Sequence, residues 1–178
     1  MASIHIIPIH ISDIKLLHSL SKEIHHQFGL PTLIQTFEFE ITFAYDAFRN
    51  QYNSSKLLWG IKNLIESADD KYLAVIEFDL FIPILTYVFG EAQLNGPVSI
   101  VSTKRLQPDF YGLPKDDMLV LDRLKKEAVH ELGHTFGLRH CADFQCVLHS
   151  STYVEEIDFK QVNFCKSCLM NLKKSMTY

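Results

Sequence analysis

The chain has 178 residues, of which 47% are hydrophobic and 21% are charged. This composition is ordinary for one globular domain and excludes collagen-like, coiled-coil and wholly disordered chains. With 17 basic and 21 acidic residues the formal net charge is −4, which argues against a nucleic-acid-binding face. The opening run 4–11 lacks the basic leader and cleavage site of a signal peptide, and no apolar segment approaches the roughly 20 residues of a membrane span. We therefore expect a soluble, cytoplasmic protein without membrane or nucleic-acid partners.

Hydrophobic periodicity predicts strands and helices that alternate over the first 137 residues. Polar caps and Gly-Pro stops, such as Ser12-Asp13 and Gly29-Leu30-Pro31, bound the first helix. The expected elements in chain order are a strand over 4–11, a helix from Ile14 to Gly29, a strand over 36–42, a helix after Asn53-Ser54-Ser55, a strand over 72–78 continued by 81–84, extended segments over 86–93 and 98–102, and a long helix from Pro114 toward Gly137.

The segment after Gly137 has few periodic signals. We therefore predict a single domain over 1–178 of the α/β class, with two parts. Residues 1–137 would carry the sheet and the long helix. Residues 138–178 would form a small, irregular C-terminal subdomain.

His130, Glu131 and His134 form an HExxH motif inside the long predicted helix. In an α-helix, residues i and i+4 share a face and lie about 6 Å apart along the axis, so both imidazoles can bind one zinc ion. Glu131 lies about 100° around the helix from His130, beside such a metal. This position suits a carboxylate that takes a proton from a zinc-bound water. The motif therefore predicts Glu131 as a catalytic base.

His140 reaches the same ion only if the helix ends before it. In a continuous helix, His140 would lie about 9 Å beyond His134 along the axis. Gly137 can adopt the left-handed backbone conformation that ends a helix. A bend at Gly137 would bring His140 to the third coordination position and leave the fourth for water. The sequence thus predicts a catalytic zinc site made by His130, His134 and His140.

The four cysteines all lie at or beyond Cys141. In a reducing compartment, such clustering indicates a metal site before disulfides, although two disulfides remain the alternative. Two pairs with short spacing together supply the four thiolates of a closed, structural zinc site: Cys141 with Cys146, and Cys165 with Cys168. Because Cys141 directly follows His140, this second zinc would order the segment that carries the third histidine.

The run from His130 to His140, HExxHxxGxxH, resembles the metzincin signature. Its extension by the two cysteine pairs is similar to the archaemetzincin family in particular. Other matching stretches are Ser151, Asp158 and Lys160, Ala44-Tyr45-Asp46 with Arg49, Gln51-Tyr52, Asp79-Leu80-Phe81 with Pro83, Phe89-Gly90-Glu91-Ala92, and Tyr111-Gly112. The resemblance implies a metallopeptidase domain with a twisted, mixed five-stranded sheet backed by helices, one of which is the active-site helix. It also implies an edge strand near 88–92 that binds an extended substrate by strand addition.

The resemblance departs from the family pattern at Leu148. Metzincins place a methionine in the turn beneath the catalytic zinc, and the Cys-x-Met of the family corresponds to Cys146-Val147-Leu148. Leucine and methionine have similar volumes, and such exchanges usually cost under about 1.5 kcal/mol. We expect the hydrophobic base beneath the histidines to be kept, with slightly altered tuning of the ligands. For His149 and Tyr153, surface positions are expected over roles in the cleft or at the oxyanion.

Together these features predict a monomeric zinc metalloprotease with two zinc ions per chain, one catalytic and one structural. It would hydrolyse peptide bonds of a peptide or protein substrate through attack of zinc-bound water, assisted by Glu131. One alternative is a zinc- and peptide-binding module with little catalysis, which Leu148 favours and the intact Glu131 opposes. Another is a hydrolase of small amides or peptide ends.

Overall fold

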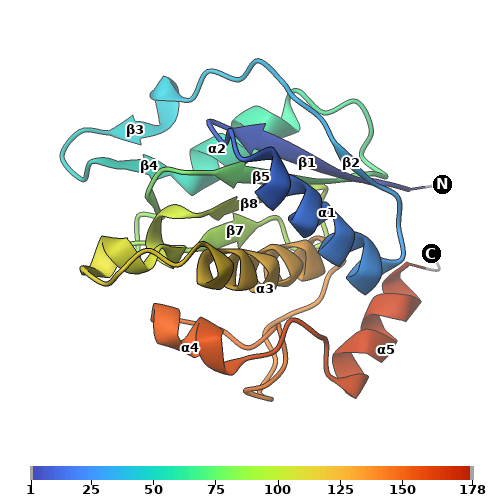
Figure 1. Ribbon diagram of the computed structural model, residues 1–178. Coiled ribbons are helices and arrows are strands. Elements are labelled where there is room, and N and C mark those ends of the chain that lie inside the picture. Colours follow the sequence, from blue (N-terminus) through green and yellow to red (C-terminus); the bar gives the residue numbers. More distant parts are fainter. Residues whose placement is uncertain (1, 177–178) are drawn as a thin grey trace.

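A five-stranded sheet forms the centre of the computed structural model, which describes residues 2–176 (Figure 1). The strand order is β2-β1-β5-β8-β7, and β7 alone is antiparallel to its neighbour in this sheet. The bounds are β1 (Ile4–Ile9), β2 (Thr32–Ile34), β5 (Lys71–Ile76), β7 (Gly90–Ala92) and β8 (Val98–Ser102). The predicted α/β class and mixed five-stranded sheet are therefore confirmed. The antiparallel edge strand lies within the expected stretch 88–92.

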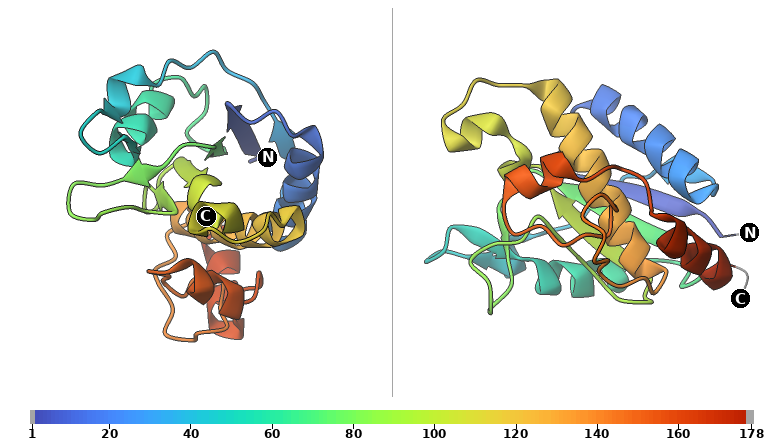
Figure 2. Two further views of the ribbon diagram at one scale, coloured as in Figure 1. Left: turned by 60° about the vertical axis from the view of Figure 1, so that its left-hand side comes forward. Right: turned by 90° about the horizontal axis from the view of Figure 1, so that it is seen from below.

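Helices cover both faces of this sheet (Figure 2). Because successive strand side chains point to opposite faces, β1 sends Ile4 and Ile6 to one core and Ile7 and Ile9 to the other. The first core lies under α1 (Ile14–Phe28) and α3 (Asp117–Thr135), and the second lies under α2 (Ser54–Lys62). The sheet thus fixes α3, the predicted active-site helix, against strands β7 and β8.

The first helix has the predicted caps. The Asp13 carboxylate accepts a hydrogen bond from the backbone N–H of Leu16. Gly29 ends the helix in the left-handed region, with φ 68°, and its N–H donates to the carbonyl of His25. Local capping chemistry therefore determines both ends of α1.

Two predicted strands are wrong. Residues 36–42 lie outside every named strand, although Phe37 and Phe39 pack against the core beside α2. Residues 81–84 do not continue β5, because β6 (Leu80–Phe81) belongs to a second, small sheet with β3 (Tyr45–Asp46) and β4 (Gln51–Asn53), in the order β3-β4-β6. Period-two alternation reports which side chains are buried, but the hydrogen-bonding partner of a strand is a tertiary property.

The C-terminal segment is more regular than expected. It contains α4 (Val154–Phe159) and α5 (Lys166–Ser175), which lie with their connecting loops on the side of α3 that faces away from the sheet (Figure 1). α4 is too short to show a periodic pattern, and α5 buries only Cys168 and Leu172. Arg123 on α3 holds α4 through two hydrogen bonds of 2.7 Å each to the Asp158 carboxylate.

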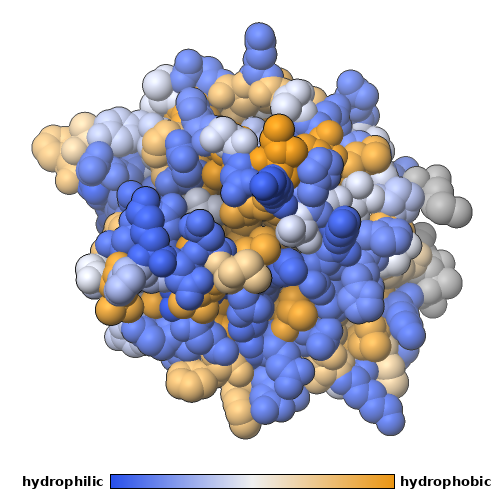
Figure 3. All heavy atoms as spheres, in the orientation of Figure 1, coloured by the Kyte–Doolittle hydropathy of each residue, from blue (hydrophilic) through white to orange (hydrophobic). Residues whose placement is uncertain are grey.

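Three short 3₁₀-helices complete the secondary structure of residues 2–176: η1 (Thr42–Ala44), η2 (Lys104–Leu106) and η3 (Pro108–Tyr111). On the face seen in Figure 3, hydrophilic side chains predominate and hydrophobic ones occur in separate groups. Within residues 2–176, no helix is long and apolar enough to cross a membrane.

Candidate active site

The end of α3 has the geometry that the HExxHxxGxxH spacing predicts. Gly137 lies in the left-handed region with φ 83°, and its N–H donates to the His134 carbonyl at 2.9 Å. The N–H of Leu138 donates to the Gly133 carbonyl at 3.2 Å, which completes the helix-ending turn. The chain leaves the helix here, so His140 comes back beside the two histidines of α3.

The ligating atoms of His130, His134 and His140 lie within 4.8 Å of one another. Nδ1 of His130 contacts the carbonyl of Val147 at 2.8 Å, and Nδ1 of His134 contacts that of Leu138 at 2.7 Å. Carbonyl oxygens only accept hydrogen bonds, so each Nδ1 carries the proton and each Nε2 carries a lone pair.

Those two Nε2 atoms are 3.0 Å apart. Two lone pairs this close repel each other unless a cation lies between them. A tetrahedral zinc ion with bonds of about 2.0–2.1 Å separates its nitrogen ligands by about 3.3 Å. The donor set and its spacing therefore fit zinc.

Burial favours the neutral, metal-binding form of these imidazoles. It lowers the pKa of His130 well below the usual range, and the Lys160 ammonium adds to this effect. Burial also lowers the pKa values of His134 and His140. At neutral pH the three side chains therefore hold lone pairs rather than positive charges.

Glu131 lines a cavity of about 320 Å³ next to the three histidines. The cavity lies between the segment 85–90, helix α3, His140 and the segment 150–152. Strand β7 packs directly on this carboxylate, since a Cβ atom built on Gly90 would lie 2.7 Å from Cγ of Glu131. Burial and the neighbouring Glu127 raise the pKa of Glu131 well above its ordinary value, and a dication nearby would oppose that rise.

Leu148 lies where the resemblance places the turn methionine. It is fully buried, and its Cδ2 would be 2.8 Å from a Cβ atom on Gly133, between the two histidines of α3. Its neighbour Val147 supplies the carbonyl that orients His130. Leu148 therefore packs against α3 at Gly133, with leucine where the family pattern has methionine.

The four cysteines converge at a second site, with all four Sγ atoms within 4.8 Å of one another and all four thiols free. Sγ of Cys141 lies 3.8 Å from Sγ of Cys165. A tetrahedral zinc ion with Zn–S bonds of about 2.3 Å gives sulfur–sulfur distances of about 3.8 Å. The geometry therefore fits a closed zinc site.

The thiol pKa values at this site diverge. Burial raises the pKa values of Cys146 and Cys168, whereas the backbone N–H of Cys168 lowers that of Cys165. A bound cation would supply the charge that stabilises all four thiolates. The N–H of Cys141 donates to the carbonyl of Leu148 at 2.9 Å, which links this site to the base of the histidine site.

The two weaker candidates lie at the margin of the site. His149 is half-buried, and its Nδ1 bonds the carbonyl of Cys141 at 3.0 Å. Tyr153 is 64% exposed at the start of α4. Neither side chain contributes to the lining of the cavity beside Glu131.

A buried ion pair that was not predicted from the sequence lies beside the site. Nζ of Lys160 lies 2.8 Å from Oε1 of Glu127, and both side chains are buried. Nζ also donates to the carbonyl of His149 at 3.2 Å. Glu127 is four residues before Glu131 and so shares its helix face, which is a signal that the sequence contained. Nothing local indicated that Lys160 would be its partner.

We expect Lys160→Met to lower the free energy of unfolding by about 3–5 kcal/mol, because it leaves the Glu127 carboxylate buried without its counter-ion. Urea denaturation measures the loss. Lys126→Met is the matched control, because Lys126 pairs with the more exposed Asp122 at 2.6 Å on the same helix. That change should cost about 1 kcal/mol or less. Equal losses in both variants would contradict a special role for the buried pair.

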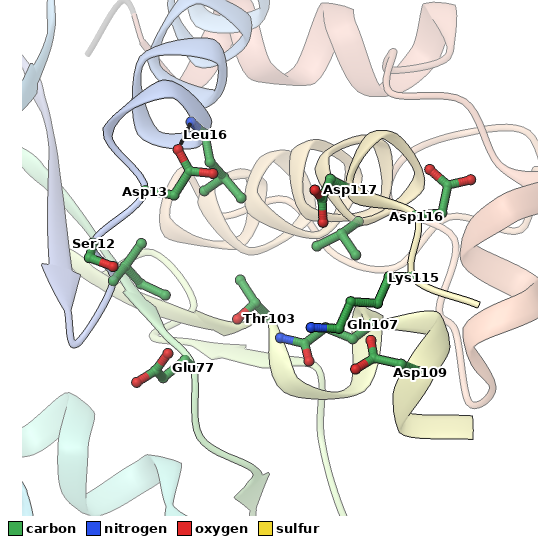
Figure 4. A pocket seen from close by; sticks show the side chains of 12 residues that line it. Ser12, Asp13, Leu16, Glu77, Thr103, Gln107, Asp109, Lys115, Asp116 and Asp117 are labelled. Carbon is green, nitrogen blue, oxygen red and sulfur yellow. Dashed lines mark hydrogen bonds between the residues drawn. The ribbon is translucent and has the colours of Figure 1, made fainter. Parts of the chain in front are cut away.

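A second cavity lies where the parallel strands β1, β5 and β8 end (Figure 4). Five carboxylates and Lys115 are among its lining groups. Two of the carboxylates already have structural roles, since Asp13 caps α1 and Asp116 caps α3. Of the residues predicted from the sequence to bind the catalytic metal and to act as the base, His130, Glu131 and His140 line the other cavity instead.

A helix-borne pair of histidines, a third histidine after a tight turn and an adjacent carboxylate on an α/β fold define a site of the metallopeptidase class. The family model for peptidase family M54 matches residues 10–174. The archaemetzincin of Methanocaldococcus jannaschii is 35% identical over 164 residues, which are 92% of this chain and 89% of that protein. The archaemetzincin of Pyrococcus furiosus is 42% identical over 136 residues, 75% of this chain and 70% of that protein. The chain thus belongs to peptidase family M54, the archaemetzincins.

Two solved structures extend the similarity to the whole fold. The archaemetzincin of Methanopyrus kandleri superposes with a TM-score of 0.84 at 30% identity, covering 99% of this chain and 96% of that one. A zinc-dependent peptidase from Methanocorpusculum labreanum gives a TM-score of 0.85 at 31% identity, covering 96% of this chain and all of that one. The similarity in fold therefore agrees with the family assignment from the sequence.

Proposed function

We propose that this protein hydrolyses peptide bonds in peptide or protein substrates, using a catalytic zinc ion held by His130, His134 and His140. The observation that carries the proposal is the 3.0 Å approach of two Nε2 lone pairs, with His140 and Glu131 beside them. Membership of family M54 supports it, as does the name of the Methanocorpusculum relative, a zinc-dependent peptidase. The metzincin class, action as a monomer and a cytoplasmic location belong to the same proposal.

When bound, zinc supplies a Lewis acid and lowers the pKa of water toward about 7. The residues of the chain have separate tasks around it. Glu131 takes the proton of the attacking water and delivers it to the leaving amine. The carbonyls of Val147 and Leu138 hold His130 and His134 in the tautomer that directs Nε2 toward the metal.

Strand β7 is the proposed platform for the substrate. One of its edges pairs with β8, from Gly90 opposite Val101 to Ala92 opposite Ser99. Its other edge is the outer edge of the five-stranded sheet, and Gly90 lies against Glu131. An extended peptide added along β7 would therefore pass the catalytic carboxylate with its backbone aligned by main-chain hydrogen bonds.

The four-cysteine site is proposed to hold a second, structural zinc ion. Its function would be to order the loop after Gly137, because Cys141 follows His140 directly and bonds the carbonyl of Leu148. This role suits a site with four thiolates and no free coordination position.

The proposal is tested by removing the metal from the protein, adding zinc back, and measuring cleavage of a diverse peptide library at each stage. We expect the zinc-loaded protein to cleave library peptides, the chelated protein to be inactive, and one added equivalent of zinc per vacant site to restore cleavage. Blocked and free peptide termini separate cleavage within a chain from removal of end residues. Peptide binding by fully loaded protein without any cleavage would reject the proposal in favour of a binding module.

Gly90→Ala should lower peptide turnover at least about tenfold without loss of either metal. The added methyl would lie 2.7 Å from Cγ of Glu131 and 2.7 Å from the Ile100 carbonyl, so either the carboxylate or β7 must move. Turnover and zinc content are measured together. Gly60→Ala is the matched control, because its methyl meets Phe43 and Phe39 on the opposite face. Unchanged turnover in the Gly90 variant would show that the close packing of Gly90 against Glu131 is not needed for catalysis.

A further inference from the structure

The cavity beside the histidines contains polar groups that hydrolysis itself does not use. His130, Glu131 and His140 line it and have roles in the proposed function. Glu127 and Ser151 also line it. Apolar residues, among them Leu85 and Val88, form part of its wall. A substrate side chain that enters this space would therefore meet an apolar wall and further polar groups, among them Glu127 and Ser151.

The Glu127 carboxylate keeps acceptor capacity despite its ion pair. One of its oxygens lies 2.8 Å from Nζ of Lys160, which is itself fully buried. A carboxylate has two oxygens and about four lone-pair positions, so one ammonium does not satisfy it. The residue is nine-tenths or more buried and lines the cavity, so a group that fills that space can supply further hydrogen-bond donors.

Ser151 presents the complementary group. Its Oγ is buried and makes no hydrogen bond within residues 2–176. A buried hydroxyl without a partner is costly and calls for an explanation such as a ligand. Lys160 lies near both segments, because its Nζ contacts the Glu127 carboxylate and the carbonyl of His149, two residues before Ser151.

Charge decides which side chain fits. A cationic side chain would meet the proposed metal beside His130 and His140, and the Glu127 carboxylate that it would approach is already paired with the buried Lys160 ammonium. An anionic side chain would meet the Glu127 and Glu131 carboxylates. A carboxamide carries no charge, donates through its NH₂ group and accepts through its carbonyl. Its NH₂ group can donate to the Glu127 carboxylate and its carbonyl can accept from the Ser151 hydroxyl, both of which line this cavity.

We propose that this cavity selects a carboxamide side chain, glutamine or asparagine, on the substrate residue next to the cleaved bond, and that Glu127 and Ser151 determine this specificity. The inference rests on the proposed peptidase function and names its substrate class. A site built to hydrogen-bond a substrate group discriminates strongly against analogues that lack it, because its own polar groups are then left unpaired.

The test uses zinc-loaded protein and peptides that differ only in one residue beside the cleaved bond: glutamine, glutamate, lysine or methionine, on either side in turn. For the wild type we expect kcat/KM for glutamine to exceed that for each of the others by about tenfold or more. Ser151→Ala should reduce the advantage over methionine by about threefold to tenfold. Glu127→Leu combined with Lys160→Met should reverse it in favour of methionine.

The double variant removes both charges at once, so that neither is left buried and unpaired. Its zinc content and melting temperature are measured first. Asp122→Asn combined with Lys126→Met is the matched control, since it removes another ion pair of α3 and should leave the preference unchanged. A double variant with both metals and an unchanged preference for glutamine would overturn the inference, as would a wild type without preference.

Binding separates this inference from the proposed function. Zinc-loaded Glu131→Ala should bind the same peptides without cleaving them, and calorimetry gives their affinities. Tighter binding of the glutamine peptide by about tenfold supports the inference even if the wild type cleaves nothing, a result that would reject only the peptidase proposal. Equal affinities, or no binding of any peptide, would overturn the inference.

Discussion

Glu131→Gln is expected to lower kcat/KM for peptide hydrolysis by about 10²–10⁴-fold while both zinc sites stay filled. Glutamine has nearly the same shape, and the space is limited because Glu131 is buried with its Cγ against Gly90. The amide cannot take a proton from water at neutral pH. The loss therefore isolates proton transfer from metal binding and from the position of the side chain.

Steady-state kinetics and metal analysis on the same samples measure this effect. Glu66→Gln, at an exposed position, is the control for the same chemical change away from the site and should leave turnover unchanged. Turnover by the Glu131 variant within about threefold of the wild type, with zinc retained, would remove Glu131 from its role as the base.

Cys165→Ser should release one zinc ion per chain and destabilise the protein by several kcal/mol. Structural zinc sites contribute their binding energy to folding, with apparent values of about 10–16 kcal/mol in small zinc modules. The three remaining thiolates would retain only part of this binding energy. The backbone N–H of Cys165 also donates to Sγ of Cys146, so the substitution acts at the centre of the cluster.

The effect should reach the catalytic site. Cys141 follows His140 and bonds Leu148, so loss of the second metal should also weaken zinc retention at the histidines. Metal stoichiometry and denaturation measure both effects, with Ser175→Ala on α5 as the control. Two zinc ions per chain with unchanged melting in the Cys165 variant would contradict the four-cysteine site.

Much of the site could be predicted from the chain alone, because helix geometry alone relates the members of its main motif. His130 and His134 share a face of any α-helix, and Gly137 is suited to end that helix before His140. The caps of α1 and the bounds of β8 were predictable for the same reason, since hydrogen bonds and side-chain alternation close to them in sequence determine them.

Features that depend on distant partners could not be predicted. Residues 36–42 have the alternation of a strand but are not paired with any strand of residues 2–176. β6 does not continue β5 and pairs with β4 instead. The short helices α4 and α5 depend on packing against the rest of the domain rather than on their own periodicity.

The sequence by itself predicted two groups of candidate metal ligands, which the structure brings together, and Glu131 as the proposed base, because each combines a diagnostic spacing with residue types that have few other uses together. Only the tertiary structure decided what surrounds them. It brought Lys160 from the C-terminal segment to Glu127, left the Ser151 hydroxyl without a hydrogen-bond partner among residues 2–176, and placed β7 against Glu131. These contacts join residues far apart in the chain, so no local pattern encodes them, and they shape the space in which a substrate would be chosen.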